Sequence, residues 1–362
     1  MNPLRPDTGD PITSVATPGP IIDENIMARN IARVQTYMDE HGLAFRPHIK
    51  THKIVAVAKA QLAAGAVGIN CQKVTEAEIF ADAGIGDILI TYNIMGPEKI
   101  GRLAALNERI SALKVVADSH ATIEGLATVF SDRKPLTVLV ECDTGGGRCG
   151  VQTPEEALAL ARQIIKSAGL SFGGLMTYPK PGSAAQIESW FSQALSLLSA
   201  NDIACPTVTN GGTPSLFQAH EVRSATEHRA GTYVYNDRAM VRAGHCTLED
   251  CAMHILATVV SRPTADRAII DAGSKALTSD LLGFEDFGYV VDYPEAVISV
   301  LTEEHGTVDL SACTGRRPEI GEKVRIIPNH TCVVSNLFDE MIFHRNGNVT
   351  RVEPVAARGM VW

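Results

Sequence analysis

One segment contains a complete strand, loop and helix: LTVLVECDTGGGRCGVQTPEEALALARQIIKS, residues 136–167. Its first six residues are mostly aliphatic and β-branched, which favours a buried strand over 136–141. Three consecutive glycines follow, and Thr153 and Pro154 then supply an N-cap and a first helical residue for a helix over 153–167. A strand followed by a loop and a helix is the building block of parallel α/β folds.

The same alternation extends between about residues 20 and 245. Helices are expected over 24–40, 74–83 and 184–200, with a short one through 216–219. Eight strands are expected, at Ala44–Pro47, Val67–Asn70, Asp87–Thr91, Leu113–Ala117, Leu136–Glu141, Phe172–Met176, Pro206–Thr209 and Thr226–Arg229. Eight such units suit a (β/α)8 TIM-like barrel. A doubly wound sheet is the rival, but no Gly-x-Gly-x-x-Gly follows the first strand.

After about residue 246 the pattern changes to short β-branched runs separated by Gly, Pro, Asp and Asn. This pattern predicts a second, β-rich domain. We therefore expect a barrel over residues 15–247 and a β-rich domain over 248–362, which residues 1–14 can also join.

Charge and composition narrow the class of partner. The formal charge of −9 argues against a nucleic-acid or anionic-membrane surface, so small metabolites are the expected ligands. No apolar run approaches the roughly 18 residues that a membrane span needs, and no signal-peptide core is visible. Eight scattered cysteines without a Cys-x-x-Cys pair indicate reduced thiols that are mostly buried. The expected location is the cytoplasm.

A basic run follows the first expected strand: Arg46-Pro47-His48-Ile49-Lys50-Thr51-His52-Lys53. Crowded positive charge and partial burial favour the neutral amine that a Schiff base requires, so Lys50 and Lys53 are both candidate covalent anchors. A solvated basic loop is the alternative. His48, His52 and Lys53 are either proton-relay groups or structural residues.

Two further loops follow strands at the expected catalytic face of the barrel. In residues 143–150, consecutive glycines permit close approach to a ligand and Arg148 can bind an oxyanion, although a simple turn is the alternative. Asn210, Gly211, Gly212 and Thr213 precede a short helix, where free N–H groups can bind phosphate. A tight turn is again the alternative.

These motifs resemble those of the D-threonine aldolase and D-serine dehydratase family. The family pattern Arg-Pro-His-x-Lys-x-x-Lys is met by Arg46, Pro47, His48, Lys50 and Lys53. The resemblance implies an alanine-racemase-like barrel that carries pyridoxal 5'-phosphate on Lys50. It also implies that His48 contacts the cofactor and that Arg148 contacts the cofactor's phenolic oxygen. Tyr178 and Tyr233 are then expected beside the ring or phosphate of the cofactor, and residues 210–213 are expected to bind its phosphate.

A metal candidate lies after the strand expected at Lys323–Ile327. Residues two apart on extended backbone point the same way, so His330 and Cys332 can converge on one ion, although such a pair is more often simple packing. The resemblance implies a divalent metal held by this pair. Imidazole with thiolate favours zinc, and manganese or magnesium is the alternative.

The resemblance implies a lyase for D-amino acids that carry a 3-hydroxyl. Retro-aldol cleavage to glycine and an aldehyde, as in D-threonine aldolase, is our first prediction. Dehydration of D-serine or 3-hydroxy-D-aspartate to a 2-oxo acid and ammonia is the alternative. The presence of a cysteine at position 332 favours this alternative. Two other functions are less favoured: a racemase that needs no metal, and a non-catalytic cofactor-binding protein. The resemblance also implies that the protein is a homodimer.

Overall fold

The computed structural model describes residues 5–362, and the chain divides into two compact units. The first, which we call the barrel unit, comprises Arg33–Lys50, Val57–Gly231 and Gly359–Trp362. The second, the β unit, comprises the described residues up to Ala32, then Thr51–Ala56 and Thr232–Arg358. The chain therefore passes between the units more than once. The domain bounds expected from the sequence, 15–247 and 248–362, stay a prediction.

The barrel unit is built on a parallel sheet of eight strands in the order β2-β9-β8-β7-β6-β5-β4-β3. The strands are β2 (Ala44–Phe45), β3 (Ile69–Cys71), β4 (Asp87–Asn93), β5 (Ala112–Ala117), β6 (Leu136–Cys142), β7 (Leu170–Thr177), β8 (Thr207–Gly211) and β9 (Glu227–Arg229). A parallel bridge between His48 and Asn70 joins the two ends of this order. The predicted barrel class is confirmed, and every predicted strand overlaps an observed one.

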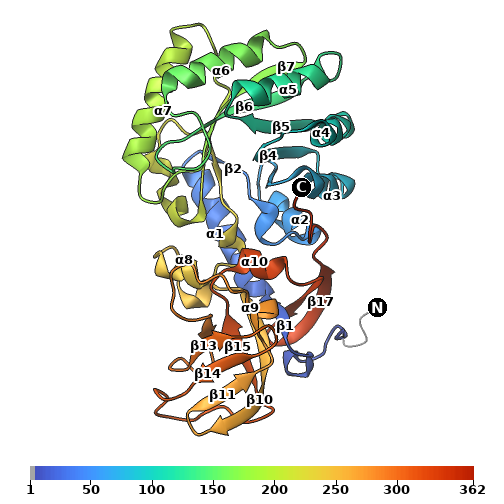
Figure 1. Ribbon diagram of the computed structural model, residues 1–362, viewed down its shortest axis with the longest axis vertical. Helices are drawn as coiled ribbons and strands as arrows, with labels where there is room; N and C mark the ends of the chain where they lie inside the picture. The colour runs from blue at the N-terminus through green and yellow to red at the C-terminus, as the bar shows by residue number, and fades with distance from the viewer. Residues whose placement is uncertain (1–4) are drawn as a thin grey trace. The chain divides into compact units, whose positions relative to one another are not determined.

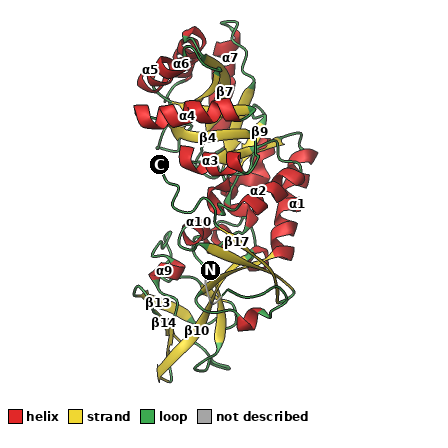
Figure 2. Ribbon diagram, turned by 90° about the vertical axis from the view of Figure 1, so that its right-hand side faces the viewer, coloured by secondary structure: helices red, strands yellow, loops and turns green. Residues whose placement is uncertain are grey.

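Helices on the outside of this sheet connect its strands (Figures 1 and 2). They are α2 (Val55–Ala63), α3 (Val74–Asp82), α4 (Pro97–Arg109), α5 (His120–Phe130), α6 (Pro154–Lys166) and α7 (Ala184–Ser199), while α1 (Glu24–Glu40) precedes β2. Helix α6 begins as expected, because Thr153 and Glu156 form a reciprocal capping box around Pro154. Local capping signals therefore set the boundary between the glycine-rich loop and its helix.

The barrel interior holds charged groups that satisfy one another. Arg46 is 3% exposed, and its guanidinium donates to Glu227 at 2.9 Å and to Asp87 at 2.7 Å. Thr209 Oγ1 donates to the other Glu227 oxygen at 2.8 Å and accepts from Arg229 at 2.8 Å. Burial lowers the pKa of Arg229 to about 10. Because each buried charge has a partner, this polar column satisfies the charges that it buries and adds little net stability.

The β unit contains a mixed sheet with the order β13-β14-β11-β10-β1-β16-β17, and β15 pairs with both β10 and β12. Its strands are β1 (Gly19–Asp23), β10 (Met253–Thr264), β11 (Arg267–Ile270), β12 (Tyr289–Val290), β13 (Val297–Leu301), β14 (Gly306–Asp309), β15 (Lys323–Ile327), β16 (Glu340–Arg345) and β17 (Asn348–Pro354). Short helices α8 (Arg238–Arg242), α9 (Ser274–Leu277) and α10 (Thr331–Ser335) interrupt the strands. The β-rich character predicted from the sequence is confirmed.

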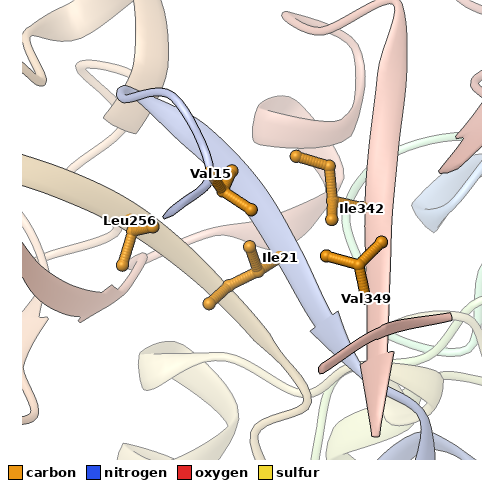
Figure 3. Close-up of a cluster of buried hydrophobic side chains, with 5 residues drawn as sticks. All are labelled: Val15, Ile21, Leu256, Ile342 and Val349. Atoms are coloured by element: carbon orange, nitrogen blue, oxygen red, sulfur yellow. The ribbon is translucent and has the colours of Figure 1, made fainter. Parts of the chain in front are cut away.

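Strand β1 was not predicted, because its five residues carry no alternation of their own. It pairs antiparallel with β10 and parallel with β16, so an early segment lies inside a sheet made mainly of late ones. Buried side chains hold it there, and Figure 3 shows this cluster of Val15, Ile21, Leu256, Ile342 and Val349. Tertiary burial, rather than local sequence pattern, creates this strand.

Among residues 5–362, none of the helices combines the length and the apolar character needed to cross a bilayer.

Candidate active site

The segment that carries Lys50 is fixed at the carboxyl end of β2. His48 N–H donates to the Ala230 carbonyl at 2.9 Å, and Ile49 is fully buried. Lys50 follows in a short 3-10 helix, Ile49–Thr51, with its side chain half-buried. Within residues 5–362 its ammonium group has no hydrogen-bond acceptor. The amine is thus held at the barrel mouth by backbone contacts while its own end stays free.

Both ring nitrogens of His48 are engaged. Nδ1 accepts a long hydrogen bond of 3.4 Å from the Lys50 N–H, and Nε2 lies 2.9 Å from Gln72 Oε1. The first contact requires an unprotonated Nδ1, so Nε2 carries the proton and donates to Gln72. His48 therefore supports the backbone of Lys50, whereas a direct cofactor contact stays a prediction.

The other two residues of the basic run with an undecided role, His52 and Lys53, both make structural contacts. His52 is fully buried and its Nδ1 accepts from Ile54 N–H at 3.0 Å. Lys53 is 7% exposed, adopts a positive φ of 55°, and donates from Nζ to the Ala357 carbonyl at 3.2 Å. Between the two candidate anchors, only Lys50 offers a free amine, which favours Lys50.

The glycine-rich loop after β6 is organised by Asp143. Its carboxylate accepts the N–H groups of Gly145 and Gly146 at 2.9 and 2.7 Å, and that of Gly147 at 3.1 Å. Burial raises the pKa of Asp143, but these backbone donors outweigh it and the net pKa is lowered. The loop is thereby held with Arg148 half exposed.

Arg148 packs against Tyr178, with its guanidinium carbon 4.7 Å from the ring centroid. A nitrogen of the same guanidinium lies 4.0 Å from a carboxylate oxygen of Glu141. Two residues that the sequence placed on separate loops are thus brought together. Lys50 makes no hydrogen bond or ring contact with either Arg148 or Tyr178 within residues 5–362.

Glu141 lies at the carboxyl end of β6 and is 3% exposed. Burial, together with the charge of Asp118, raises its pKa despite the nearby Arg148 and a 3.3 Å hydrogen bond from Asn93. Asp118, Glu141 and Cys149 each place a donor atom within 4.8 Å of the others, the one such group of three among residues 5–362. By itself, a cluster of this kind assigns no ion.

The loops after β8 and β9 provide the candidate phosphate site. Gly211 of β8 pairs with Arg229 of β9 in the parallel sheet. Thr213 and Gly231 each follow these paired residues by two positions, so both lie just beyond the carboxyl ends of their strands. Neither of their N–H groups has an acceptor within residues 5–362. Gly212 has a φ of 119°, which only glycine adopts readily. A Cβ on Gly211 would lie 2.9 Å from the Arg229 carbonyl, so this backbone is closely packed.

The remaining predicted cofactor residues lie near this site in sequence or space. Asn210 is 3% exposed, and its Oδ1 accepts from Gly211 N–H at 2.8 Å. Tyr178 is 47% exposed, and a Cβ built on Gly212 would lie 3.9 Å from its ring. Tyr233 is 1% exposed within the short helix Thr232–Val234 of the β unit. The barrel unit therefore presents free N–H groups, an arginine, an aromatic ring and an amine along one edge, which suits pyridoxal phosphate.

The candidate metal ligands lie in the β unit, and one expectation about them is wrong. His330 has extended backbone, with φ −143° and ψ 101°, but it is the N-cap of α10, and Cys332 lies inside that helix. The two do not share a strand. They still interact, since Cys332 raises the pKa of the His330 imidazole against the effect of burial. The turn into the helix, rather than strand periodicity, brings imidazole and thiol together.

Further groups support these two ligands. Asp280 Oδ2 lies 2.6 Å from His330 Nδ1, which leaves Nε2 as the nitrogen available to a metal. Burial lowers the pKa of His330, but the contacts with Cys332 and Asp280 outweigh it and raise that pKa to about 9. Asp237 accepts from the Thr331 N–H at 3.1 Å and fixes the loop. A nitrogen–sulfur pair backed by a carboxylate suits a zinc-like ion whose other positions are open.

Cys332 also contacts two hydroxyl groups. Thr51 Oγ1 lies 3.2 Å from its sulfur, and Thr232 Oγ1 lies 3.7 Å away. Thr51 directly follows Lys50 in the chain. The peptide bond between them therefore joins the candidate cofactor lysine to a residue that contacts the candidate metal ligand.

This combination of fold and site defines an alanine-racemase-type barrel enzyme with an added β-rich domain. The model of the alanine racemase N-terminal domain matches residues 22–239, and that of a putative serine dehydratase domain matches residues 252–344. The chain therefore belongs to this family.

Among curated relatives, D-threonine aldolase of Arthrobacter sp is 35% identical over 99% of this chain and 96% of its own length. D-threo-3-hydroxyaspartate dehydratase of Delftia sp. (strain HT23) is also 35% identical, over 91% and 94%. The crystal structure of D-threonine aldolase from Filomicrobium marinum matches with a TM-score of 0.91, 31% identity and coverage of 99% and 100%. A cysteine-to-alanine mutant of D-threo-3-hydroxyaspartate dehydratase in the metal-free form matches with a TM-score of 0.87, 33% identity and coverage of 98% and 100%.

Sequence reasoning did not find several supporting residues. Asp280 precedes His330 by 50 positions, and no local motif connects them. Gln72, Thr51 and Glu141 each stand beside a recognised motif, but their roles depend on side chains from other segments. A polar residue at the end of a barrel strand, as at Glu141, was the available signal.

Proposed function

We propose that this protein is a pyridoxal-phosphate- and metal-dependent lyase that cleaves D-3-hydroxy amino acids, with retro-aldol cleavage to glycine and an aldehyde as its principal reaction. The observation that carries the proposal is the 3.2 Å contact between Thr51 and Cys332, because Thr51 directly follows Lys50. The proposal combines a cofactor held by Lys50 with a metal that acts on the 3-hydroxyl of the substrate.

The barrel unit supplies the residues that would hold pyridoxal phosphate. Lys50 offers the free amine, and the N–H groups of Thr213 and Gly231 are available to phosphate oxygens. Arg148, held by its packing against Tyr178, offers a fixed positive charge to the phenolic oxygen. When bound, the cofactor supplies an electron sink that stabilises charge developing at the substrate α-carbon.

The β unit supplies the residues that would hold the metal. His330 and Cys332 provide nitrogen and sulfur, and Asp280 orients the imidazole through Nδ1. When bound, a divalent ion supplies Lewis acidity toward the substrate hydroxyl. The Thr51 and Thr232 hydroxyls, 3.2 and 3.7 Å from the Cys332 sulfur, can donate to the thiolate and so keep it oriented. We propose zinc, because the donor pair includes a thiolate.

Dehydration is the second candidate function. One aldolase and one dehydratase are each 35% identical to this chain. A metal-free form of the dehydratase carries a cysteine-to-alanine change. A metal held by His330 and Cys332 fits dehydration as well as aldol cleavage. The two reactions differ in which proton is removed from the substrate: the hydroxyl proton or the α-proton.

One assay separates the two functions. The protein, supplied with pyridoxal phosphate and Zn²⁺, is incubated with D-threonine, D-serine and 3-hydroxy-D-aspartate, and aldehyde and ammonia are followed together. Glycine with aldehyde supports the aldolase, whereas a 2-oxo acid with ammonia and no aldehyde identifies the dehydratase. Reactions with and without chelator, and with His330→Ala, are the controls. Formation of aldehyde or ammonia that survives both would contradict metal dependence.

Two further expectations belong to this proposal. A homodimer is proposed on the family resemblance, and size-exclusion chromatography with light scattering would test it. The cytoplasm is proposed as the location because none of the eight cysteines, all within residues 5–362, forms a disulfide, as is usual in a reducing compartment.

A further inference from the structure

The β unit contains a cavity that the proposed function does not use. Its volume is about 400 Å³, and none of the candidate cofactor or metal residues is among those that line it. Aliphatic side chains make up much of its wall, and a few polar groups join them. A largely apolar cavity of this size with a small number of polar groups is the usual form of a small-molecule site.

Strand register places polar groups of the cavity on one face of the sheet. His344 of β16 pairs with Asp23 of β1, and His254 of β10 pairs with Ile21, two residues before Asp23. Paired residues point to the same face of a sheet, and so do residues two apart along a strand. Asp23 and both imidazoles therefore project from the same side, and all three line the cavity.

Both histidines are buried, and neither ring is fully satisfied. His344 is 6% exposed, and its Nδ1 is buried without a hydrogen-bond partner within residues 5–362. His254 is 8% exposed. Burial lowers the pKa of both rings, to about 4 for His254, and the charge of Arg325 lowers both further. Both imidazoles are therefore neutral at pH 7, and each can accept one hydrogen bond. A buried polar atom without a partner is uncommon in folded proteins and indicates a group that binds a ligand or water.

The charges around the cavity favour a cation. Asp23 Oδ1 accepts two N–H groups of the first turn of α1, at 2.9 and 3.1 Å, whereas Oδ2 accepts none within residues 5–362. Glu249 adds a second carboxylate to the lining. Arg325 also lines the cavity, but Asp292 binds its guanidinium, with Nη2 2.6 Å from Oδ1. A cation therefore has carboxylates to pair with, whereas an anion meets an arginine that is already neutralised.

We propose that this cavity binds a small primary ammonium compound with an aliphatic body. The ammonium group donates hydrogen bonds to the Asp23 carboxylate and the His344 imidazole. Adjacent strands lie roughly 4.8 Å apart, a separation that one nitrogen can bridge with two hydrogen bonds. The aliphatic body packs against Leu248 and Ile327, while neutral His254 adds no competing positive charge. No covalent bond forms or breaks, so this is a binding site and not a second catalytic centre.

A transition-metal ion is the main alternative, because imidazole and carboxylate groups also bind such ions. A closed metal site needs at least three ligand atoms close together. Asp23, His254 and His344 do not form a group whose donor atoms all lie within 4.8 Å of one another. The structure therefore favours the ammonium ligand.

The test measures binding of isoamylamine by isothermal titration calorimetry. The protein is loaded with pyridoxal phosphate and Zn²⁺ and is then reduced with borohydride, so that the cofactor cannot form an imine with the amine. Isoamyl alcohol and isovalerate keep an aliphatic body of similar size and replace the ammonium with a neutral or a negative group. We expect the amine to bind and neither analogue to bind.

Two results of this titration would overturn the proposal. One is binding of the alcohol or of isovalerate at least as tightly as the amine. The other is competition by excess Zn²⁺, which would assign the cavity to a metal. A protein that takes up no pyridoxal phosphate would contradict the proposed function only, and the titration would then be made without cofactor.

Three variants locate the binding site. Asp23→Asn keeps an oxygen for the first turn of α1 but removes the charge, and should weaken binding about ten-fold. His344→Phe keeps an aromatic ring without an acceptor and should also weaken binding. Leu248→Trp fills the cavity from a partly exposed position and should abolish binding. Asp266→Asn, at an exposed carboxylate of the same unit, is the matched control and should bind isoamylamine normally.

Thermal melts show whether each variant folds. Should Asp23→Asn or His344→Phe fail to fold, Leu248→Trp still decides, since it changes no polar group. Equal affinity for isoamylamine in the folded variants and in the control would place the amine elsewhere and overturn the proposal.

Discussion

Replacing Asp280 with asparagine should weaken metal binding without disturbing the fold. Asp280 Oδ2 lies 2.6 Å from His330 Nδ1, and asparagine keeps the size of the side chain while removing its charge. If His330 is a metal ligand, the carboxylate holds the imidazole with Nε2 available to the ion and increases its basicity. Asp280→Asn therefore tests whether His330 is a ligand without removing His330 itself.

The expected effect follows from the geometry. Loss of a carboxylate behind a ligating histidine typically costs 10- to 100-fold in metal affinity, or about 1.4 to 2.7 kcal/mol. The side chains of His330 and Asp280 are 26% and 35% exposed, so solvent already screens part of their interaction. We therefore expect a loss near the lower limit, about ten-fold in the dissociation constant for Zn²⁺.

The assay is a competition between protein and a chromophoric zinc chelator at fixed pH, alongside a thermal melt of the metal-free protein. Asp266→Asn is the matched control, because Asp266 is an exposed carboxylate of the same unit that pairs with Arg317. We expect the control to bind Zn²⁺ like the unsubstituted protein. Equal affinity in Asp280→Asn and the control, with both melts unchanged, would refute the assignment of His330 as a ligand.

Three further predictions concern the cofactor, the barrel and pH. Lys50→Ala should lose the visible absorbance band of the bound cofactor and the lyase activity together, because Lys50 offers the free amine of its segment. Arg46→Met should destabilise the protein by about 3 kcal/mol in urea unfolding, since it leaves Glu227, 7% exposed, without its 2.9 Å partner. Burial, with Arg325 and His344, lowers the pKa of His254 to about 4. The unfolded chain therefore binds a proton near pH 6.5 that the folded protein excludes, so this stabilisation is complete above about pH 6.5 and is lost toward pH 4, by up to about 1.4 kcal/mol per pH unit.

Each of these has a matched control. Lys59→Ala, which replaces an exposed lysine of the same unit, is the control for Lys50→Ala and should keep the cofactor band. A band that persists in Lys50→Ala would show that the cofactor is attached to another residue. Adding Glu227→Gln to Arg46→Met should recover part of the lost stability, and no recovery would argue against the charge explanation. His254→Leu should flatten the decline in stability between pH 6.5 and 4, whereas exposed His305→Gln should not. Identical slopes in the two variants would contradict the role of His254.

Local signals in the sequence were enough for most elements of the barrel. Helix α1 covers the predicted Glu24–Glu40, and strand β15 covers the predicted Lys323–Ile327, because periodicity and breakers lie within each segment. Strand β1 was missed since its identity depends on β10 and β16, which lie far along the chain. The same holds for the polar column, whose members Arg46, Asp87 and Glu227 come from separate strands.

By itself, the sequence determined the order of strands and helices, the β-rich second domain and the candidate residues Lys50, Arg148, His330 and Cys332. These follow from residue types and spacings that act over a few positions. Only the tertiary structure decided that Cys332 lies in a helix, that Asp280 orients His330 and that Thr51 contacts the thiol. Such contacts join segments separated by up to 281 positions, and chain folding rather than local preference determines which of them meet.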